Sequence, residues 1–306
     1  MPNSITYASL SNVLPHQRLA MYERVFSTST PVELHGAYIW SVKAATCLHP
    51  LLSALEVALR NSIHTTATNK IGADWYDKLA TRKRKNWRAE QRDKSNIAWH
   101  KQHVADVKKK ISGKTPPKGL TVHDLLVAKM DFGFWDNLLR ECFSKNGDKN
   151  ALWPQCIPSV FPNLPKGQGL TNAKIQQEIS ILRALRNDIA HHSPIWKHNS
   201  VHDTQSAIDF INNKIDKILE VIGWLSSEKV DWIEVHMLRS EAKRIVSKEY
   251  LCLCQRKNLD EIQQSYSTYK RTLRTKLKAQ DKEKFDLIKT GNGALYMVTK
   301  ITSAKK

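Results

Sequence analysis

The chain has 306 residues, with 48 Lys and Arg against 29 Asp and Glu, a formal net charge of +19, and 41% of its residues are hydrophobic. This hydrophobic fraction excludes wholesale disorder, and the length favours a core domain with an appendage over a single domain. We find neither a signal peptide nor an apolar run of the kind that spans a bilayer, so we expect a cytoplasmic protein that uses no membrane.

The cysteines and most histidines indicate no metal or cofactor. Five cysteines scattered along the chain are typical of reduced thiols rather than of a disulfide framework, and we expect them to be buried or idle. The pairs His100–His103 and His198–His202 have the spacing of two metal ligands, but no third ligand of the right kind accompanies either pair. We therefore expect surface histidines, no metal and no cofactor.

Lys and Arg gather in two segments of the chain. Residues 78–118 hold fourteen of them with three acidic residues, and residues 239–306 hold seventeen with seven. Such segregation favours a polyanion-binding protein, and phosphate backbones are the commonest polyanion, although solubility and a flexible tail are the alternative. The candidate nucleic-acid-binding residues are the cations of the first segment, namely Arg82, Lys83, Arg84, Lys85, Arg88, Lys108, Lys109 and Lys110.

The hydrophobic periodicity is helical nearly throughout, which predicts an all-α protein. In residues 48–63 the apolar side chains fall on one helical stripe, with Pro50 in the first turn of that helix. Glu56 and Arg60 lie four residues apart, where they share a face. The stripe consists of Leu48, Leu51, Leu52, Leu55, Leu59 and Ile63.

The next segment, 78–110, mixes basic residues with Trp87 and Trp99. Two interpretations stay open: the tryptophans stack on unpaired bases, or the segment is a solvated amphipathic helix whose tryptophans reach back to the core. Residues 112–119 form a loop by their Gly and Pro content.

Residues 121–139 predict one helix or two short ones, capped by Thr121 or Asp124. Phe132, Phe134 and Trp135 are expected in the core. Residues 151–169 form a proline-rich connection.

A helix over 171–190 begins at Thr171 or Asn172 and must end near Ser193, because Pro194 disfavours α geometry in the preceding residue. Its predicted apolar stripe is Ile175, Ile179, Leu182, Leu185 and Ile189.

The remaining chain predicts one amphipathic helix over 204–226 and, beyond about residue 238, basic and weakly hydrophobic helices with a frayed end. The expected organisation is a helical domain over 1–235, with a basic insertion at about 78–118, and a basic helical extension over 236–306.

The sequence "RNDIAHH" at the end of helix 171–190 carries the candidate site. Arg186 falls within the apolar stripe, so its guanidinium needs a partner, and Glu56 is a plausible one. Asn187 and His191 are four residues apart and share a face, and His191 lies in the last turn, where the helix dipole favours a cation. Arg, a polar residue and His, without metal ligands nearby, favour phosphodiester transfer in RNA: His moves the proton of the attacking 2′-OH or of the leaving oxygen, and Arg neutralises the phosphoryl charge.

The same motif matches the R-x4-6-H pattern of the HEPN superfamily of helical ribonucleases. The wider chain resembles the Abi-like (abortive infection) branch of that superfamily over about residues 16–225. Four segments carry the resemblance in the family's order: "RLAMYERVF" at 18–26, "LLSALEVALRN" at 51–61, "VAKMDFGFWDNLL" at 127–139 and "LRALRNDIAHHSPIW" at 182–196.

The resemblance implies a HEPN-like helical bundle and a metal-independent endoribonuclease of phage defence or a toxin. Arg186 would contact phosphate and stabilise the transition state, Asn187 would orient the phosphate or the histidine, and His191 would be the general acid or base. Two facing motifs in a homodimer would supply both an acid and a base. His192, Glu56, and Arg60 are possible supporting residues, with structural roles favoured.

Two alternatives remain: a non-catalytic RNA-binding module, and a sensor that is silent until a phage component binds it. A phage-encoded trigger or an antitoxin is a possible partner.

Overall fold

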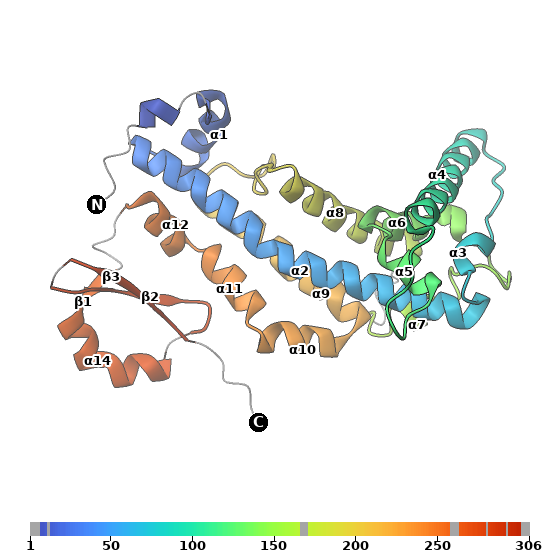
Figure 1. The fold of residues 1–306 in the computed structure, drawn as a ribbon. Helices are drawn as coiled ribbons and strands as arrows, with labels where there is room; N and C mark the ends of the chain where they lie inside the picture. Colours follow the sequence, from blue (N-terminus) through green and yellow to red (C-terminus); the bar gives the residue numbers. More distant parts are fainter. Residues whose placement is uncertain are drawn as a thin grey trace. The chain divides into compact units, whose positions relative to one another are not determined.

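The computed structural model describes residues 7–10, 13–165, 171–257, 263–279, 281–291 and 293–300. These residues are mostly helical with one small sheet, shown in Figure 1. The elements of the first part are η1 (Tyr7–Leu10), α1 (His16–Phe26), α2 (Pro31–Ile71), α3 (Trp75–Lys78), α4 (Trp87–Ile111), α5 (Val122–Ala128), α6 (Phe132–Leu138), η2 (Glu141–Phe143) and α7 (Ile157–Val160). Those of the second part are α8 (Asn172–Ala190), α9 (Thr204–Leu225), α10 (Ser227–Val235), α11 (Leu238–Ile245), α12 (Lys248–Gln255), β1 (Gln263–Ser265), α14 (Tyr266–Ala279), β2 (Phe285–Lys289) and β3 (Leu295–Thr299).

The chain divides into two compact units, and the boundaries between them fall within helices. The first unit comprises residues 1–51, 188–217 and 231–306, and the second comprises residues 52–187 and 218–230. The division of the chain at residue 235, expected from the sequence, stays a prediction.

Helix α2 supplies core residues along its length. All six apolar residues of the predicted 48–63 stripe are at most 1% exposed. The helix is longer than predicted because it begins at Pro31, so Pro50 lies inside it and not in its first turn. An internal proline removes one backbone hydrogen bond, to the carbonyl four residues earlier. Here that carbonyl belongs to Thr46, and both Thr46 and Pro50 are exposed, so water can replace the missing donor.

The length and composition of α2 also satisfy a membrane-span criterion. An 18-residue window within Pro31–Ile71 has a mean hydropathy of 1.3. The expectation that the chain contains no long apolar run was therefore wrong by composition. The core helix of a soluble protein passes the same test when it is mostly buried. Helix α2 carries the buried stripe described above, and 39% of the apolar window is buried.

In the second unit, α4 packs against α5 and α6 (Figure 1). The predicted core residues Phe132, Phe134 and Trp135 of α6 are buried. Thr121 and Asp124 form a reciprocal capping box at the start of α5, which confirms the predicted helix start. Residues 112–119 form the predicted loop, and the proline-rich connection contains α7, although its residues 166–169 lie outside the described residues.

Helix α8 begins where the sequence predicts. The Thr171 hydroxyl accepts the Lys174 N–H at 3.4 Å, whereas Asn172 is buried and donates its side-chain N–H to Leu139 O at 2.6 Å. Four residues of the predicted stripe are buried and Ile189 is half-buried. The predicted helix 204–226 is confirmed as α9.

The end of the chain departs from the all-α prediction. Strand β1 pairs parallel to β2, with Gln263 opposite Leu287, and β2 pairs antiparallel to β3, with Leu287 opposite Met297. Helix α14 connects β1 to β2 and packs on both strands (Figure 1). Leu287 and Ile288 are the buried residues of this small sheet. The extension beyond about residue 238, expected to be helical, is helical in α14 only as far as Ala279 and continues into strands.

Helices α11 and α12 are part of the core of the first unit. The Trp40 indole donates to Ile245 O at 2.8 Å. A Cβ on Gly36 would lie 2.4 Å from both Cys254 O and Gln255 Cα, so only glycine permits α2 and α12 to approach this closely. The basic extension therefore begins with helices packed on α2.

All five cysteines are free thiols, as predicted. Burial raises the pKa of Cys47 and of Cys142 to about 12, which keeps both protonated and unreactive at neutral pH.

Candidate functional site

The motif "RNDIAHH" ends helix α8 in a Schellman turn. The His192 N–H donates to Ile189 O at 3.1 Å and the Ser193 N–H donates to Asp188 O at 2.8 Å, which is the hydrogen-bond pair of that motif. His192 occupies its left-handed position with a φ of 56°. The His192 carbonyl also accepts from Arg18 Nη2 at 2.8 Å. His192 therefore has a backbone role that the sequence pattern did not reveal.

The turn directs the chain back into the core of the first unit. Ile195 and Trp196 are buried directly after it. The Trp196 indole donates to the Ser41 hydroxyl at 3.1 Å and its ring meets Tyr22 edge-on at 5.1 Å. These contacts fix the position at which α8 ends, and hence the position of His191.

Arg186 and Asn187 lie in the last turns of α8, and both are half-buried. Arg186 Nη1 lies 3.5 Å from the Asn187 side-chain oxygen, a contact at the long limit of a hydrogen bond. His191 directly follows α8 and is exposed. An exposed imidazole can exchange protons with a substrate, and a half-buried guanidinium presents fixed donors to a phosphate.

The possible supporting residues Glu56 and Arg60 are both half-buried on α2. Arg60 Nε donates to the Asn61 side-chain oxygen at 3.3 Å. The expected pairing of Glu56 with Arg186 stays a prediction.

The sequence pattern missed a buried carboxylate. Asp136 on α6 is 1% exposed and accepts hydrogen bonds from Ser180 Oγ at 2.6 Å and Gln176 Nε2 at 2.9 Å. Arg183 Nε lies 2.9 Å from the other oxygen, but its N–H does not point at that oxygen, so the contact is an ion pair only. Gln176, Ser180 and Arg183 recur at helical spacing beside the apolar stripe, and this polar stripe indicates that α8 contacts a polar partner, without identifying Asp136.

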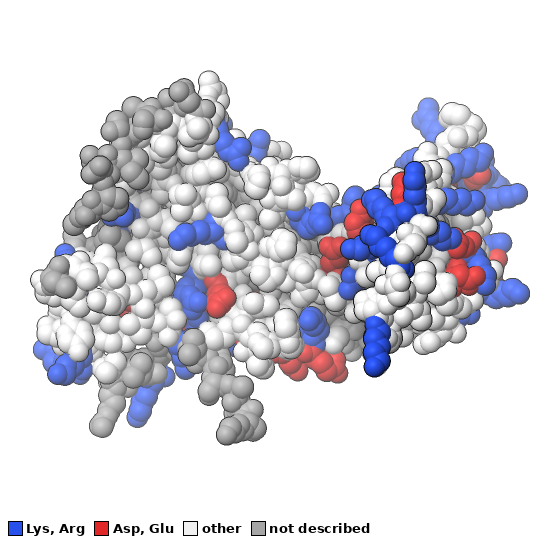
Figure 2. All heavy atoms as spheres, viewed as in Figure 1, with Lys and Arg blue, Asp and Glu red and all other residues white. Residues whose placement is uncertain are grey.

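The predicted nucleic-acid-binding cations divide into two groups. Arg82 and Arg84 both contact Glu141, Arg84 also contacts Asp93, and Lys108 pairs with Asp77 at 2.6 Å. The others are exposed, and Figure 2 shows Lys and Arg crowding the surface that α4 forms. The exposed group is Lys83, Lys85, Arg88, Lys109 and Lys110.

The two tryptophans of α4 do not reach the core. Trp87 is 72% exposed and Trp99 is 41% exposed, with the Trp99 ring stacked on His103 at 4.9 Å. The interpretation in which these tryptophans pack inward is wrong. The buried face of α4 consists of Ala89, Asp93, His100, Val104, Val107 and Ile111.

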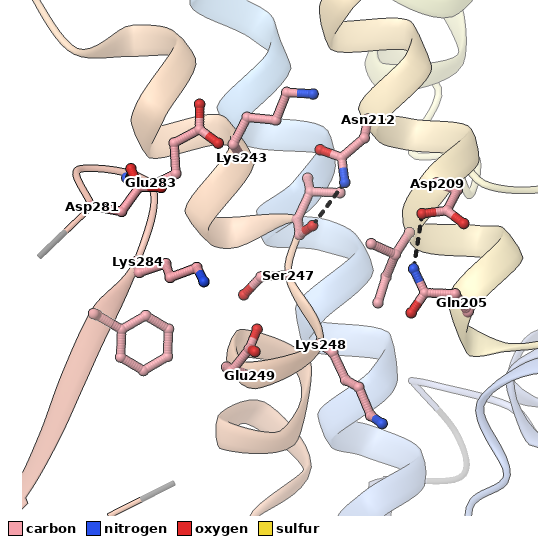
Figure 3. Close-up of a pocket in the computed structure, with 13 residues that line it drawn as sticks. Gln205, Asp209, Asn212, Lys243, Ser247, Lys248, Glu249, Asp281, Glu283 and Lys284 are labelled. Atoms are coloured by element: carbon pink, nitrogen blue, oxygen red, sulfur yellow. Dashed lines mark hydrogen bonds between the residues drawn. The ribbon is translucent and has the colours of Figure 1, made fainter. Parts of the chain in front are cut away.

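The first unit contains a hollow of about 670 Å³ between α9, the start of α12 and the residues before β2 (Figure 3). Asn212 donates to Val246 O across one wall, and Gln205 donates to Asp209 on α9. Lysines and carboxylates are interspersed around the hollow, among them Lys284 and Glu249. This mixed lining does not select a polyanion. Within the described residues no group of three or more His, Cys, Asp or Glu could hold a metal ion.

Comparison with known proteins gave one match. The model of a family described as Abi-like protein matches residues 13–197. No curated protein and no solved structure matches the chain. The matched region includes Arg186, Asn187 and His191, whereas the hollow of Figure 3 lies wholly beyond it.

Proposed function

The chain belongs to the Abi-like protein family, whose members suggest a role in abortive infection, and we propose that it acts in phage defence, or as a toxin, as a metal-independent endoribonuclease. The observation that carries the proposal is the end of α8, where Arg186 and Asn187 occupy the last turns and His191 follows within the matched region. We further propose a HEPN-like bundle for the helical core, a homodimer as the working form and the cytoplasm as the location.

The reaction uses groups that RNA and this chain both provide. His191 takes the proton of the 2′-OH, which attacks the adjacent phosphorus in line and expels the 5′-oxygen of the next nucleotide. Arg186 stabilises the charge on the phosphoryl oxygens, and Asn187 orients the phosphate. The His191 of a second chain protonates the leaving oxygen, and the products carry a 2′,3′-cyclic phosphate and a 5′-hydroxyl. Such a positioned acid or base contributes about 10²–10⁴ in rate.

The exposed cations before and on α4 support the choice of substrate, namely Lys83, Lys85, Arg88, Lys109 and Lys110. They present positive charge without a carboxylate partner on a protein of net charge +19, and each phosphate contact releases counterions. The exposed Trp87 and Trp99 add faces on which unpaired bases can stack.

The experiment is cleavage of total bacterial RNA in EDTA, with the new ends mapped. We expect cleavage by the wild type that leaves 2′,3′-cyclic phosphate, and none by Arg186→Ala or His191→Ala protein of unchanged fold. His202→Ala removes another exposed histidine and is the matched control. Cleavage that survives the double substitution Arg186→Ala and His191→Ala overturns the proposal.

If neither the wild type nor any variant cleaves RNA, two further measurements distinguish the alternative functions. RNA binding without cleavage, unchanged by co-expression with phage proteins, favours a non-catalytic binding module. Toxicity that appears only on such co-expression favours a sensor with a phage-encoded trigger.

A further inference from the structure

We propose that a hollow in the second unit, between α4, the start of η2 and the start of α8, is a phosphate-binding subsite. It binds a phosphate of the RNA chain that is distant from the scissile bond. The inference rests on the proposed function for the identity of its ligand, but not for the site itself. The hollow measures about 300 Å³. Its lining includes Arg84, Arg92, Asp93, Arg140, Glu141 and Ala173.

The two carboxylates of the hollow are already neutralised. Asp93 is 6% exposed and lies 2.7 Å from Arg84 Nε. Glu141 is contacted by Arg84 and, at 3.2 Å, by Arg82. Arg82 and Arg84 are therefore paired with carboxylates of the protein. The positive charge that remains for a ligand is that of Arg140 and of Arg92, which is exposed.

Arg140 has an unsatisfied donor at this place. Its Nε is buried and has no hydrogen-bond partner. Its Nη2 lies 3.9 Å from Asp136, too far for a hydrogen bond, and that carboxylate already has Ser180, Gln176 and Arg183 around it. The Nε atom itself is too buried for a ligand to reach, but the Arg140 side chain is 37% exposed, so its terminal nitrogens can donate to a phosphate oxygen in the hollow.

The start of α8 adds a favourable field. Ala173, in the first turn of this 19-residue helix, lines the hollow. The first N–H groups of a helix have no intrahelical acceptor, and the helix dipole places partial positive charge there, so anions bind at such ends. Two guanidinium groups and this helix end thus converge on one small, polar space.

The position of the hollow indicates that its ligand is a distant phosphodiester of the same RNA. Ala173 and Arg186 are thirteen residues apart on one straight helix, which corresponds to about 20 Å. The phosphate in the hollow is therefore not the one cleaved near Arg186. Arg183, whose guanidinium is paired with Asp136, lies between the two points along α8.

The test uses single-stranded 2′-O-methyl RNA, which cannot be cleaved, so that binding is measured whether or not the protein is a nuclease. Arg92→Gln and Arg140→Gln are compared with Lys101→Gln, which removes the same charge from an exposed position of α4 outside the hollow. We expect each hollow variant to lower the slope of log K against log salt by about 1 relative to Lys101→Gln, and Arg140→Lys to restore part of it. Unchanged circular dichroism spectra show that the fold is kept.

A second arm uses inorganic phosphate alone. We expect phosphate to raise the melting temperature of the wild type and of Lys101→Gln, but not of the Arg92→Gln, Arg140→Gln double variant. Loss of the phosphate effect with unchanged RNA binding would keep the anion site and overturn its assignment to RNA. Equal behaviour of all variants in both arms would overturn the subsite altogether.

Discussion

His192 illustrates how one of two adjacent histidines is set apart by its backbone. It occupies the left-handed position of the α8 terminus, a conformation that costs a non-glycine residue about 1–2 kcal/mol. His191 precedes it and is free of that constraint. The structure thus gives His192 a task in ending the helix and leaves the chemistry of the proposal to His191.

We predict that His192→Gly keeps RNA cleavage and leaves the melting temperature unchanged or higher, because glycine adopts a positive φ without strain. His192→Val should lower the melting temperature, because a β-branched residue resists that conformation. Thermal unfolding and the EDTA cleavage assay measure the two effects. A His192→Gly protein that is stable but inactive would show that the His192 side chain takes part in the reaction.

The residues of the candidate site differ in whether a local sequence pattern can identify them. Arg186, Asn187 and His191 could be singled out because they lie within six residues of one another on a helix of clear period. Asp136 could not, because its partners Gln176 and Ser180 are 40 and 44 residues away. Its burial depends on how α6 meets α8, which no local pattern contains.

At the scale of elements, α4 is held within the second unit by His100, which is only 3% exposed, so the expectation that it is a surface histidine was wrong. His100 Nε2 donates to Tyr76 O at 2.9 Å, and its ring stacks on Phe134 at 4.9 Å. Burial lowers the pKa of His100, and the hydrogen bond to the Tyr76 carbonyl opposes this only in part. The imidazole of His100 is therefore neutral in the folded chain, and its protonation would weaken the packing of α4 in the second unit.

The lowered pKa of His100 determines how the free energy of unfolding depends on pH. A histidine whose folded pKa is lowered has no effect on stability above its ordinary value of about 6.5, and below that pH the unfolded chain binds the proton first. We predict that the free energy of unfolding falls as the pH is lowered from 7 to 5, by about 1.4 kcal/mol for each unit of pKa difference. Urea unfolding should show a shallower fall for His100→Gln. Parallel curves for the two proteins would contradict the prediction.

Elements were predicted well where periodicity alone decides them and poorly where it does not. The stripes of 48–63 and 175–189 gave helices in the right places. The start of this helix was predicted wrongly at Pro50, because a proline in a first turn and a proline on the exposed face of a longer helix look alike in sequence. The strands Phe285–Lys289 and Leu295–Thr299 were not predicted, because five residues are too few to show a clear alternation of apolar and polar residues. Their conformation depends on the pairing between strands.

At the scale of the whole molecule, the family match and the packing divide the chain differently. The match ends at residue 197, yet the first unit contains residues from both sides of that limit. Val246 and Leu251 are 1% exposed, and Lys243 lies 2.7 Å from Asp216 on α9. The first helices after residue 235, α11 and α12, are thus an integral part of the first unit.

This packing predicts the outcome of truncation. A chain ending at residue 235 loses α11 and α12, which exposes the Trp40 indole and the close contact at Gly36, and we expect it to unfold at a lower temperature or to aggregate. A chain ending at residue 257 keeps both helices and loses only the sheet and α14, so it should unfold cooperatively near the temperature of the full chain. Scanning calorimetry of the three proteins measures this. If the chain ending at 235 is as stable as the full chain, the extension is a separable domain, because removing helices that cover Trp40 would otherwise cost the apolar burial that they provide.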